Sequence, residues 1–317
     1  MNIYKNPIYE IILLVICTCF FKTAVAQKVE TVYLDPNDST SNFYIIVYPP
    51  QLPWSGYMFL IQGMFQQAED LFVQTDLPMH AAQQGILTII PVFRTGISSF
   101  GLDTATQASF LEILDHVTDH HKLFDQPFYV GGFSIGGTCA IKYAELAYDN
   151  DYSIKPAAVF AIDSPLDFER IYNTIVREKR LLPKGSEPQP EGEYILKRLE
   201  GVFGGAPNEA IQHYYSISPY SFNDTSQQAI KPLKNLPIRF YTEPDVVWWL
   251  QDGTDYAGMN SFDFAAMTNE LRRMGNTRVE MITTENRGYR KPGNDRHPHS
   301  WSIAEPQDLV KWLKAQE

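Results

Sequence analysis

Cysteine is scarce in this sequence, with three residues in a chain of 317. Two of them, Cys17 and Cys19, lie close to the N-terminus, and only Cys139 lies in the remainder. A segment with one cysteine cannot form an internal disulfide bond, so its stability must come from a hydrophobic core. The sequence is long enough to build such a core within one large α/β domain.

Basic residues are also in short supply, since 26 Lys and Arg face 37 Asp and Glu for a net charge of −11. This acidic balance argues against nucleic acid or an anionic membrane as the partner. The hydrophobic fraction of 44% and the charged fraction of 20% are those of an ordinary globular protein. They exclude the disordered, collagen-like and coiled-coil classes.

Long hydrophobic runs are missing apart from one near the N-terminus. Lys5 precedes an apolar run over residues 11–21, and Ala24-Val25-Ala26 follows. This order is typical of a secretory signal peptide, whereas a membrane anchor would need roughly 20 apolar residues. We therefore expect residues 1–26 to be a signal peptide, and residues 27–317 to be a secreted or periplasmic protein without a membrane anchor.

Beyond the signal peptide, short β-branched and aromatic runs alternate with helical patterns. This alternation is typical of a mostly parallel sheet covered by helices. The first two or three strands are expected to form an antiparallel edge. The strands are predicted at residues 29–34, 43–48, 57–61, 86–92, 127–133, 157–162, 237–242 and 279–284.

Two amphipathic patterns predict helices that pack on this sheet. The first follows the fourth predicted strand, with Asp103 or Thr104 as its N-cap. The second begins at Pro306, a residue that suits a first helical turn. Their apolar faces recur at helical spacing and comprise Phe110, Ile113, Leu114 and Val117 in the first, and Leu309, Trp312 and Leu313 in the second.

Residues 167–230 interrupt the alternation, because they carry helical patterns around Ile171 and Leu199 but no strand pattern. This segment lies between the sixth and seventh predicted strands. An insertion there should lie over the carboxyl ends of the strands, where doubly wound sheets bind ligands. We interpret it as a helical cap.

The most informative motif is the G-F-S-I-G-G run at residues 132–137, which contains Ser134. It follows a predicted strand and opens a predicted helix, which is the context that a nucleophile elbow requires. The flanking glycines allow a sharp turn, so the serine hydroxyl should project above the sheet. Ser134 is therefore the candidate nucleophile.

A serine nucleophile needs an imidazole base and a carboxylate that orients the imidazole. Both should follow the nucleophile in the sequence. Because His213 falls within the predicted cap, the base is His297 or His299. For the acid, we favour Asp245, which directly follows the seventh predicted strand, and keep Asp163 after the sixth as the alternative.

At these residues the chain resembles the α/β-hydrolase superfamily. Its second half is similar to the catalytic domain of prolyl-oligopeptidase-like enzymes and secreted esterases. The resemblance covers about residues 43–315. The matching parts are residues 132–137, Ser218-Pro219, Leu236-Pro237-Ile238 leading to Glu243-Pro244-Asp245, and His299 followed by Trp301.

The resemblance implies an α/β-hydrolase fold, with an eight-stranded, mostly parallel sheet flanked by helices. It assigns the oxyanion hole to the backbone N–H groups of Met64 and Ile135, and the base to His299, just before Ser300-Trp301. One position departs from the pattern: Gln62 precedes Gly63 where such enzymes often have histidine. Backbone N–H groups form an oxyanion hole, so Gln62 is compatible with activity.

Several other residues are candidates for the substrate site. Trp248 and Trp249 follow Asp245 and are expected to bind substrate, and His297 is expected at the mouth of the site. A basic run over residues 287–296 could steer a substrate that carries a carboxylate, although a solvated loop is the simpler interpretation. Three histidines at residues 116–121 are interpreted as a solvent-facing helix surface, so we predict neither a metal nor a cofactor.

Together these features predict an exported serine hydrolase that cleaves small-molecule carboxylic esters through a covalent acyl-enzyme. One alternative is a serine peptidase of the prolyl-oligopeptidase type, because the same triad cleaves amides. A second alternative is a binding protein that keeps the α/β-hydrolase fold without turnover, because a fold does not by itself imply a function.

Overall fold

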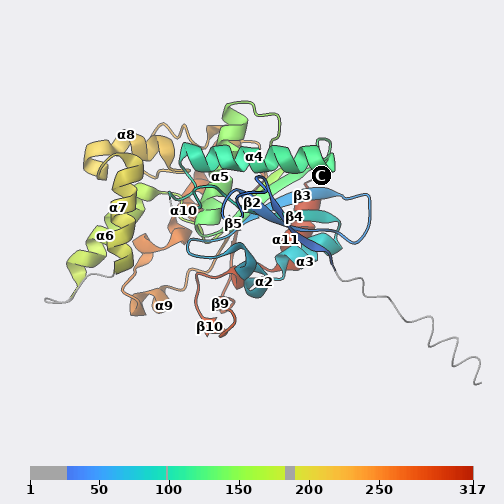
Figure 1. The fold of residues 1–317 in the computed structure, drawn as a ribbon. Coiled ribbons are helices and arrows are strands. Elements are labelled where there is room, and N and C mark those ends of the chain that lie inside the picture. The colour runs from blue at the N-terminus through green and yellow to red at the C-terminus, as the bar shows by residue number, and fades with distance from the viewer. Residues whose placement is uncertain (1–26, 98, 183–189, 317) are drawn as a thin grey trace, which may run out of the picture.

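The computed structural model describes residues 27–97, 99–182 and 190–316, so the predicted signal peptide lies outside the described residues. An eight-stranded sheet with the order β1-β2-β4-β3-β5-β6-β7-β8 forms the centre of the molecule (Figure 1). All eight predicted strands are confirmed to within one residue at each end. They are β1 (Val29–Tyr33), β2 (Phe43–Val47), β3 (Gly56–Ile61), β4 (Ile86–Val92), β5 (Phe128–Phe133), β6 (Ala158–Ile162), β7 (Ile238–Thr242) and β8 (Val279–Thr283).

Most of the sheet is parallel. The pairs from β4 through β3, β5, β6 and β7 to β8 are all parallel, whereas β1 with β2 and β2 with β4 are antiparallel. The predicted antiparallel edge therefore consists of the first two strands. Strands such as β3 and β5 are buried at every residue, as expected for parallel strands that are covered on both faces.

Helices cover both faces of the sheet (Figure 1). On one face, α4 (Thr104–His121), α5 (Ile135–Asp149) and α10 (Asn260–Arg273) contribute to the larger hydrophobic core. On the other face, α3 (Leu77–Gln83) and α11 (Pro306–Lys314) contribute to the second core. The helices predicted before the fifth strand and after Pro306 are confirmed as α4 and α11. The Asp103 side chain caps α4 by accepting a hydrogen bond from the N–H of Thr106.

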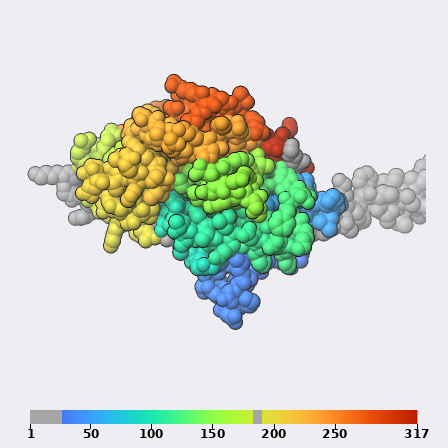
Figure 2. All heavy atoms as spheres, turned by 90° about the horizontal axis from the view of Figure 1, so that it is seen from above, coloured from blue at the N-terminus to red at the C-terminus, as the bar shows by residue number. Residues whose placement is uncertain are grey.

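Three helices, α6 (Phe168–Leu181), α7 (Pro190–Phe203) and α8 (Pro207–Ile217), lie between β6 and β7, within the segment interpreted as a cap. The yellow-green to yellow colours of Figure 2 show these helices gathered at one end of the molecule. Their buried aromatic residues Phe168, Phe203 and Tyr214 join the larger core. This packing attaches the inserted helices firmly to the sheet.

The remaining elements are short and connect the larger ones. A two-stranded antiparallel sheet after β8 was not predicted, because each of its strands has only two residues and carries no periodic signal. Within the described residues, no helix combines the length and the apolar character needed to cross a membrane. The short elements are η1 (Ala68–Asp70), α2 (Leu71–Gln74), η2 (Lys231–Leu233), α9 (Val246–Gln251), η3 (Tyr256–Gly258), β9 (Tyr289–Arg290), β10 (Asp295–Arg296) and η4 (Trp301–Ile303).

Candidate active site

Ser134 stands at the turn between β5 and α5. Its backbone has φ 53° and ψ −128°, a conformation that a residue with a side chain rarely adopts and that is typical of a nucleophile elbow. A Cβ atom on Gly132 or Gly136 would lie 2.4 or 2.2 Å from the carbonyl oxygen of Ile61. These glycines therefore let the turn and the start of α5 pass close to β3.

The loop after β10 brings His299 to this serine. The Nε2 atom of His299 lies 3.1 Å from the Oγ atom of Ser134. Its Nδ1 atom lies 2.7 Å from the Oδ2 atom of Asp163. An imidazole that donates its Nδ1 proton to a carboxylate keeps Nε2 available to accept the serine proton. Side chains from three distant segments thus form one hydrogen-bonded line.

The prediction that Asp245 orients the base is wrong, and the alternative, Asp163, occupies that position. One Asp245 oxygen accepts a hydrogen bond from the backbone N–H of Trp248 at 3.0 Å. The other oxygen lies 2.7 Å from the Nη2 atom of Arg296. The physical reason is that Asp245 is already engaged by Arg296 and by the start of α9, whereas the Asp163 carboxylate faces His299.

Asp163 is held in place by its neighbours. Its side chain is buried, and its Oδ1 atom accepts a hydrogen bond from the Thr242 hydroxyl at 2.8 Å. The side-chain amide of Asn260 donates to the Asp163 backbone carbonyl, also at 2.8 Å. The backbone of Asp163 has φ 43°, so these contacts maintain a turn that would otherwise be unfavourable.

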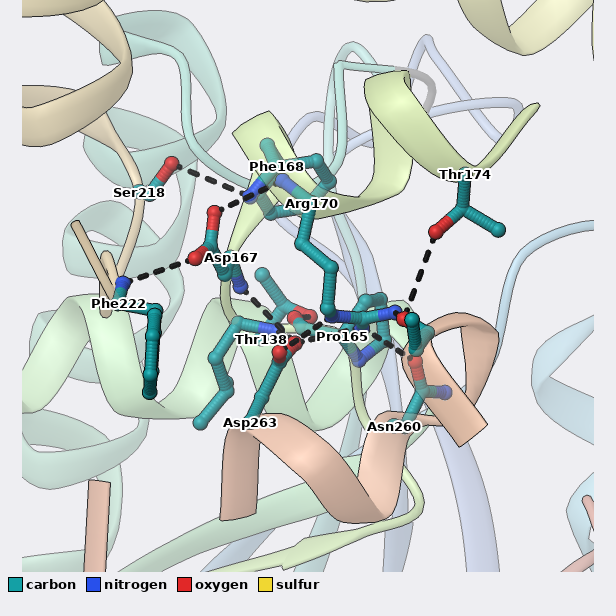
Figure 3. A network of polar contacts seen from close by, with 12 residues as sticks. Thr138, Pro165, Asp167, Phe168, Arg170, Thr174, Ser218, Phe222, Asn260 and Asp263 are labelled. Atoms are coloured by element: carbon teal, nitrogen blue, oxygen red, sulfur yellow. Dashed lines mark hydrogen bonds and ion pairs between the residues drawn. The ribbon is translucent and has the colours of Figure 1, made fainter. Parts of the chain in front are cut away.

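A buried charge network supports this turn from behind (Figure 3). Arg170 of α6 points between two residues of α10, with its Nη2 atom 2.7 Å from Asp263 Oδ2 and 3.2 Å from Asn260 Oδ1. Asp263 also accepts the backbone N–H of Asp167 at 3.0 Å. Burial, together with the nearby charge of Asp263, raises the pKa of Asp167 to about 7. Through Asn260 the network connects α6 to the Asp163 turn.

His297, the other candidate base, makes different contacts. Its Nδ1 atom accepts a hydrogen bond from the backbone N–H of His299 at 3.1 Å, so the neutral ring carries its proton on Nε2. The ring centroid lies 4.6 Å from that of Trp248 and 5.7 Å from that of Trp249. Burial, followed by the charge of Arg290, lowers the pKa of His297 to about 3. His297 is therefore neutral near pH 7.

Glu243 anchors the loop that carries both histidines. Its carboxylate is 2% exposed and accepts hydrogen bonds from the Thr284 hydroxyl at 2.9 Å and from the Gly288 N–H at 3.1 Å. Its Oε1 atom forms an ion pair with Arg296 at 2.6 Å. The Gly288 carbonyl in turn accepts the backbone N–H of His297 at 3.0 Å. In the sequence, Glu243 stands out only as part of the Glu243-Pro244-Asp245 run, because no local pattern reveals the contacts of its side chain.

Ser134 and His299 line a cavity of about 670 Å³. Met64 and Ile135, the candidates for the oxyanion hole, also line this cavity. Within the described part of the chain, neither of their backbone N–H groups donates to another residue.

The rest of the cavity wall combines apolar with polar and charged side chains. Of the three residues expected to bind substrate, Trp249 and His297 line the cavity, whereas Trp248 does not and instead packs against His297. Several apolar side chains from the body of the protein and from α6 and α7 complete the wall, namely Phe100, Phe133, Phe168, Ile171, Ile195 and Trp301. The inserted helices thus form part of the cavity.

Gln66 is a second residue that the sequence analysis missed. Its Oε1 atom accepts hydrogen bonds from the Gly63 N–H at 2.9 Å and from the Trp301 indole N–H at 3.2 Å. Gln66 therefore ties the loop after β3 to the segment that follows His299. Gln62, which departs from the family pattern, is buried, and its Oε1 atom has no hydrogen-bond partner among the described residues.

The histidines of α4 contact aromatic rings and one another. The rings of His116 and His120 stack with their centroids 5.8 Å apart, and the Tyr44 hydroxyl lies 3.1 Å from His116 Nδ1. In the described ranges, no group of three or more His, Cys, Asp or Glu side chains is placed to hold a metal ion.

Comparison with solved structures identifies the architecture. Esterase B from Lactobacillus rhamnosis has a TM-score of 0.59 at 12% identity, over 98% of this chain and 93% of that one. The chain has the α/β-hydrolase fold. A bacterial heroin esterase gives a TM-score of 0.55 at 14% identity, over 98% and 90% of the two chains. An esterase from the bacterial hormone-sensitive lipase family gives 0.53 at 12% identity, over 92% and 84%.

At these identities, the similarity shows the fold and no more. No family model and no curated protein sequence matches this chain. In the α/β-hydrolase fold, the oxyanion is bound by the N–H that follows the nucleophile and by an N–H from the loop after β3. Ile135 and Met64 occupy these two positions relative to Ser134.

Proposed function

We propose that this protein is a serine hydrolase that cleaves carboxylic esters, with Ser134 as nucleophile, His299 as general base and Asp163 as the acid of the triad. The observation that carries the proposal is the position of His299, 3.1 Å from the Ser134 hydroxyl and 2.7 Å from the Asp163 carboxylate. A serine hydroxyl is a weak nucleophile until a positioned base accepts its proton. This arrangement can supply that base.

The reaction proceeds in two steps of acyl transfer. Ser134 Oγ attacks the ester carbonyl while His299 Nε2 takes the hydroxyl proton, and the N–H groups of Met64 and Ile135 stabilise the oxyanion. His299 then gives its proton to the departing alkoxide, which leaves an acyl-enzyme. Water attacks the acyl-enzyme by the same route and releases the acid. Throughout, Asp163 stabilises the imidazolium form of His299.

An ester substrate is favoured over a peptide for two reasons. The solved structures with similar folds include proteins that are named as esterases. The cavity of about 670 Å³ is bounded by α6 and α7, and this size suits a small molecule. In this proposal, the inserted helices act as a cap that limits the substrate.

We also propose that residues 1–26 are a signal peptide and that the protein acts outside the cytoplasm. The support is the apolar run followed by Ala24-Val25-Ala26. Mass spectrometry of exported protein should find Gln27 as the first residue. An exported chain that still begins at Met1 would contradict this assignment.

The direct test of the function is Ser134→Ala. We expect a folded variant with at least roughly a thousandfold lower kcat on nitrophenyl esters, because the nucleophile is lost while the core is unchanged. Ser216→Ala, on the exposed surface of α8, is the matched control and should keep full activity. Full ester hydrolysis by Ser134→Ala would contradict the proposal.

The same assay separates the alternative functions. We expect wild-type protein to hydrolyse nitrophenyl esters faster than peptide anilides. Turnover of peptide anilides in addition to the more reactive esters would indicate a peptidase, and turnover of neither class would indicate a binding protein.

A further inference from the structure

The basic run on the loop before His299 divides into two parts in the structure. Arg296 faces the protein interior, where it forms ion pairs with Glu243 and Asp245. Arg290 and Lys291 instead line the cavity that contains Ser134. The cavity therefore holds two cationic side chains that the proposed acyl transfer does not use.

Arg290, an exposed residue, differs from the arginines that the fold surrounds. Arg170, Arg239 and Arg296 each form an ion pair with at least one carboxylate. Within the described residues, Arg290 forms no ion pair, and its only hydrogen bond runs from Nε to the backbone carbonyl of His299 at 3.2 Å. The Nη1 and Nη2 groups of Arg290 are left without a protein acceptor in the part of the chain that the structure describes.

The position of Arg290 is determined by the backbone around it. Its bond to the His299 carbonyl fixes the side chain beside the residue that carries the proposed base. The Gln74 side chain bonds the backbone N–H and carbonyl of the next residue, Lys291. Although part of the side chain is exposed, burial lowers the pKa of Arg290, and the carboxylates of Glu191 and Asp252 only partly compensate. An arginine stays protonated, so the site carries a positive charge that no ion pair among the described residues neutralises.

The two carboxylates of the cavity lie toward the inserted helices. Glu191 and Asp252 also line a second cavity, of about 450 Å³, between α6 and α7, and neither Arg290 nor Lys291 reaches that one. The active-site cavity thus carries two carboxylates and two cations. An anionic group would be repelled by the carboxylates and attracted by the cations.

We propose that Arg290 binds a carboxylate carried by the ester substrate, with Lys291 adding positive charge. The protein therefore selects half-esters of dicarboxylic acids, or esters in which a hydroxy acid supplies the alcohol. This inference rests on the proposed function. The free Nη groups of a guanidinium match a carboxylate with two parallel hydrogen bonds. The apolar part of the wall accommodates the uncharged part of the ester.

The test compares substrates that differ in one charge. On the acyl side, nitrophenyl half-esters of dicarboxylic acids are paired with nitrophenyl esters of the same length in which a methyl ketone replaces the free carboxylate. On the alcohol side, acetoxybenzoate is paired with acetoxybenzamide. We expect kcat/KM to favour the anionic member of at least one pair by about 10- to 100-fold, the range of a charge-assisted hydrogen bond. Which pair shows the preference will tell whether the carboxylate lies on the acyl or on the alcohol side.

Variants then assign the preference to one side chain. Arg290→Gln should remove the preference, so that kcat/KM falls much further for the anionic esters than for the neutral ones. Arg290→Lys should keep part of it. Arg287→Gln, in the same basic run but with an exposed side chain outside the cavity, should keep all of it. An equal loss for charged and neutral esters in Arg290→Gln, or no preference in wild type, would overturn the inference while leaving the proposed function intact.

A binding measurement makes the result independent of turnover. The N-phenyl half-amide of a dicarboxylic acid is not an ester, and calorimetry can follow its binding to Ser134→Ala. We expect the affinity to fall at least about tenfold when Arg290→Gln is added. Unchanged affinity in the double variant would overturn the inference, even if the protein proved not to hydrolyse esters.

Discussion

The turns after β6 and β7 both present carboxylates at the same edge of the sheet, but the carboxylates have different partners. After β6, Asp163 accepts hydrogen bonds from the Thr242 hydroxyl and from His299. After β7, Glu243 and Asp245 both form ion pairs with Arg296. The first turn therefore has a carboxylate available to an imidazole, and the second has carboxylates that hold a loop in place.

The difference shows that a place at the end of a strand does not by itself make a carboxylate the acid of a triad. A carboxylate that already faces a guanidinium has its charge largely neutralised, so it stabilises a developing imidazolium less. Among the described side chains, Asp163 forms no ion pair with a lysine or an arginine, and its Oδ2 atom is left to His299. The turn after β7 contributes indirectly, because it positions the loop that delivers His299.

The largest expected effect is a difference in kcat between variants of these two turns. Asp163→Asn should lower kcat for ester hydrolysis by about 10⁴-fold, because the amide favours the wrong imidazole tautomer. Asp245→Asn should lower it less than about tenfold, since Asp245 contacts Arg296 and not His299. Steady-state kinetics with circular dichroism as a folding control will decide, and a larger loss in Asp245→Asn would reverse the assignment.

A second prediction concerns the pH dependence of stability behind the β6 turn. The pKa of Asp167 is raised from 3.8 to about 7, so the folded state holds the proton more tightly than the unfolded state. The contribution of protonated Asp167 to the unfolding free energy is fully present below pH 3.8 and is lost as the pH rises to about 7. The loss is at most about 4 kcal/mol of unfolding free energy.

Urea unfolding at a series of pH values measures this contribution. Asp167→Asn cannot titrate, so its unfolding free energy should fall less than that of wild type between about pH 4 and pH 7. Equal slopes in the two proteins would show that Asp167 is ionised in the fold throughout this range.

A third prediction tests the β7 turn as an anchor. Glu243→Gln removes the ion pair with Arg296 but leaves that guanidinium its contact with Asp245, so we expect a loss of about 2 to 3 kcal/mol in unfolding free energy. Because the histidine loop is then less well held, kcat should fall about 10- to 100-fold. Wild-type kcat in a destabilised Glu243→Gln would show that the anchor serves stability alone.

The sheet could be predicted from the sequence because β-branched runs such as Ile86–Val92 are local signals, and buried parallel strands are almost uniformly apolar. The serine elbow was equally accessible, since Gly132 and Gly136 are required by steric contacts within one turn. Choosing between Asp163 and Asp245 was not possible in the same way, because each follows a strand directly. That choice depends on which partners each carboxylate meets in the folded protein, Arg296 for Asp245 and His299 for Asp163.

A smaller effect, on substrate binding, is expected at His297. Its pKa is lowered to about 3, so it should contribute no ionisation to the rate profile between pH 5 and 8. His297→Ala should lose about tenfold in kcat/KM, mainly through KM, because the ring lines the cavity and does not contact Ser134. A change in the shape of the pH profile in this variant would indicate a direct role in proton transfer.

The rate at which a fluorophosphonate modifies Ser134 tests the central claim most directly, because it reports the activated nucleophile without any choice of substrate. Peptide mapping should place a single adduct on Ser134 in wild type and in Asp245→Asn, formed at similar rates. In Asp163→Asn the adduct should form at least roughly a thousandfold more slowly. An adduct on another residue, or slow labelling in Asp245→Asn beside fast labelling in Asp163→Asn, would contradict the account.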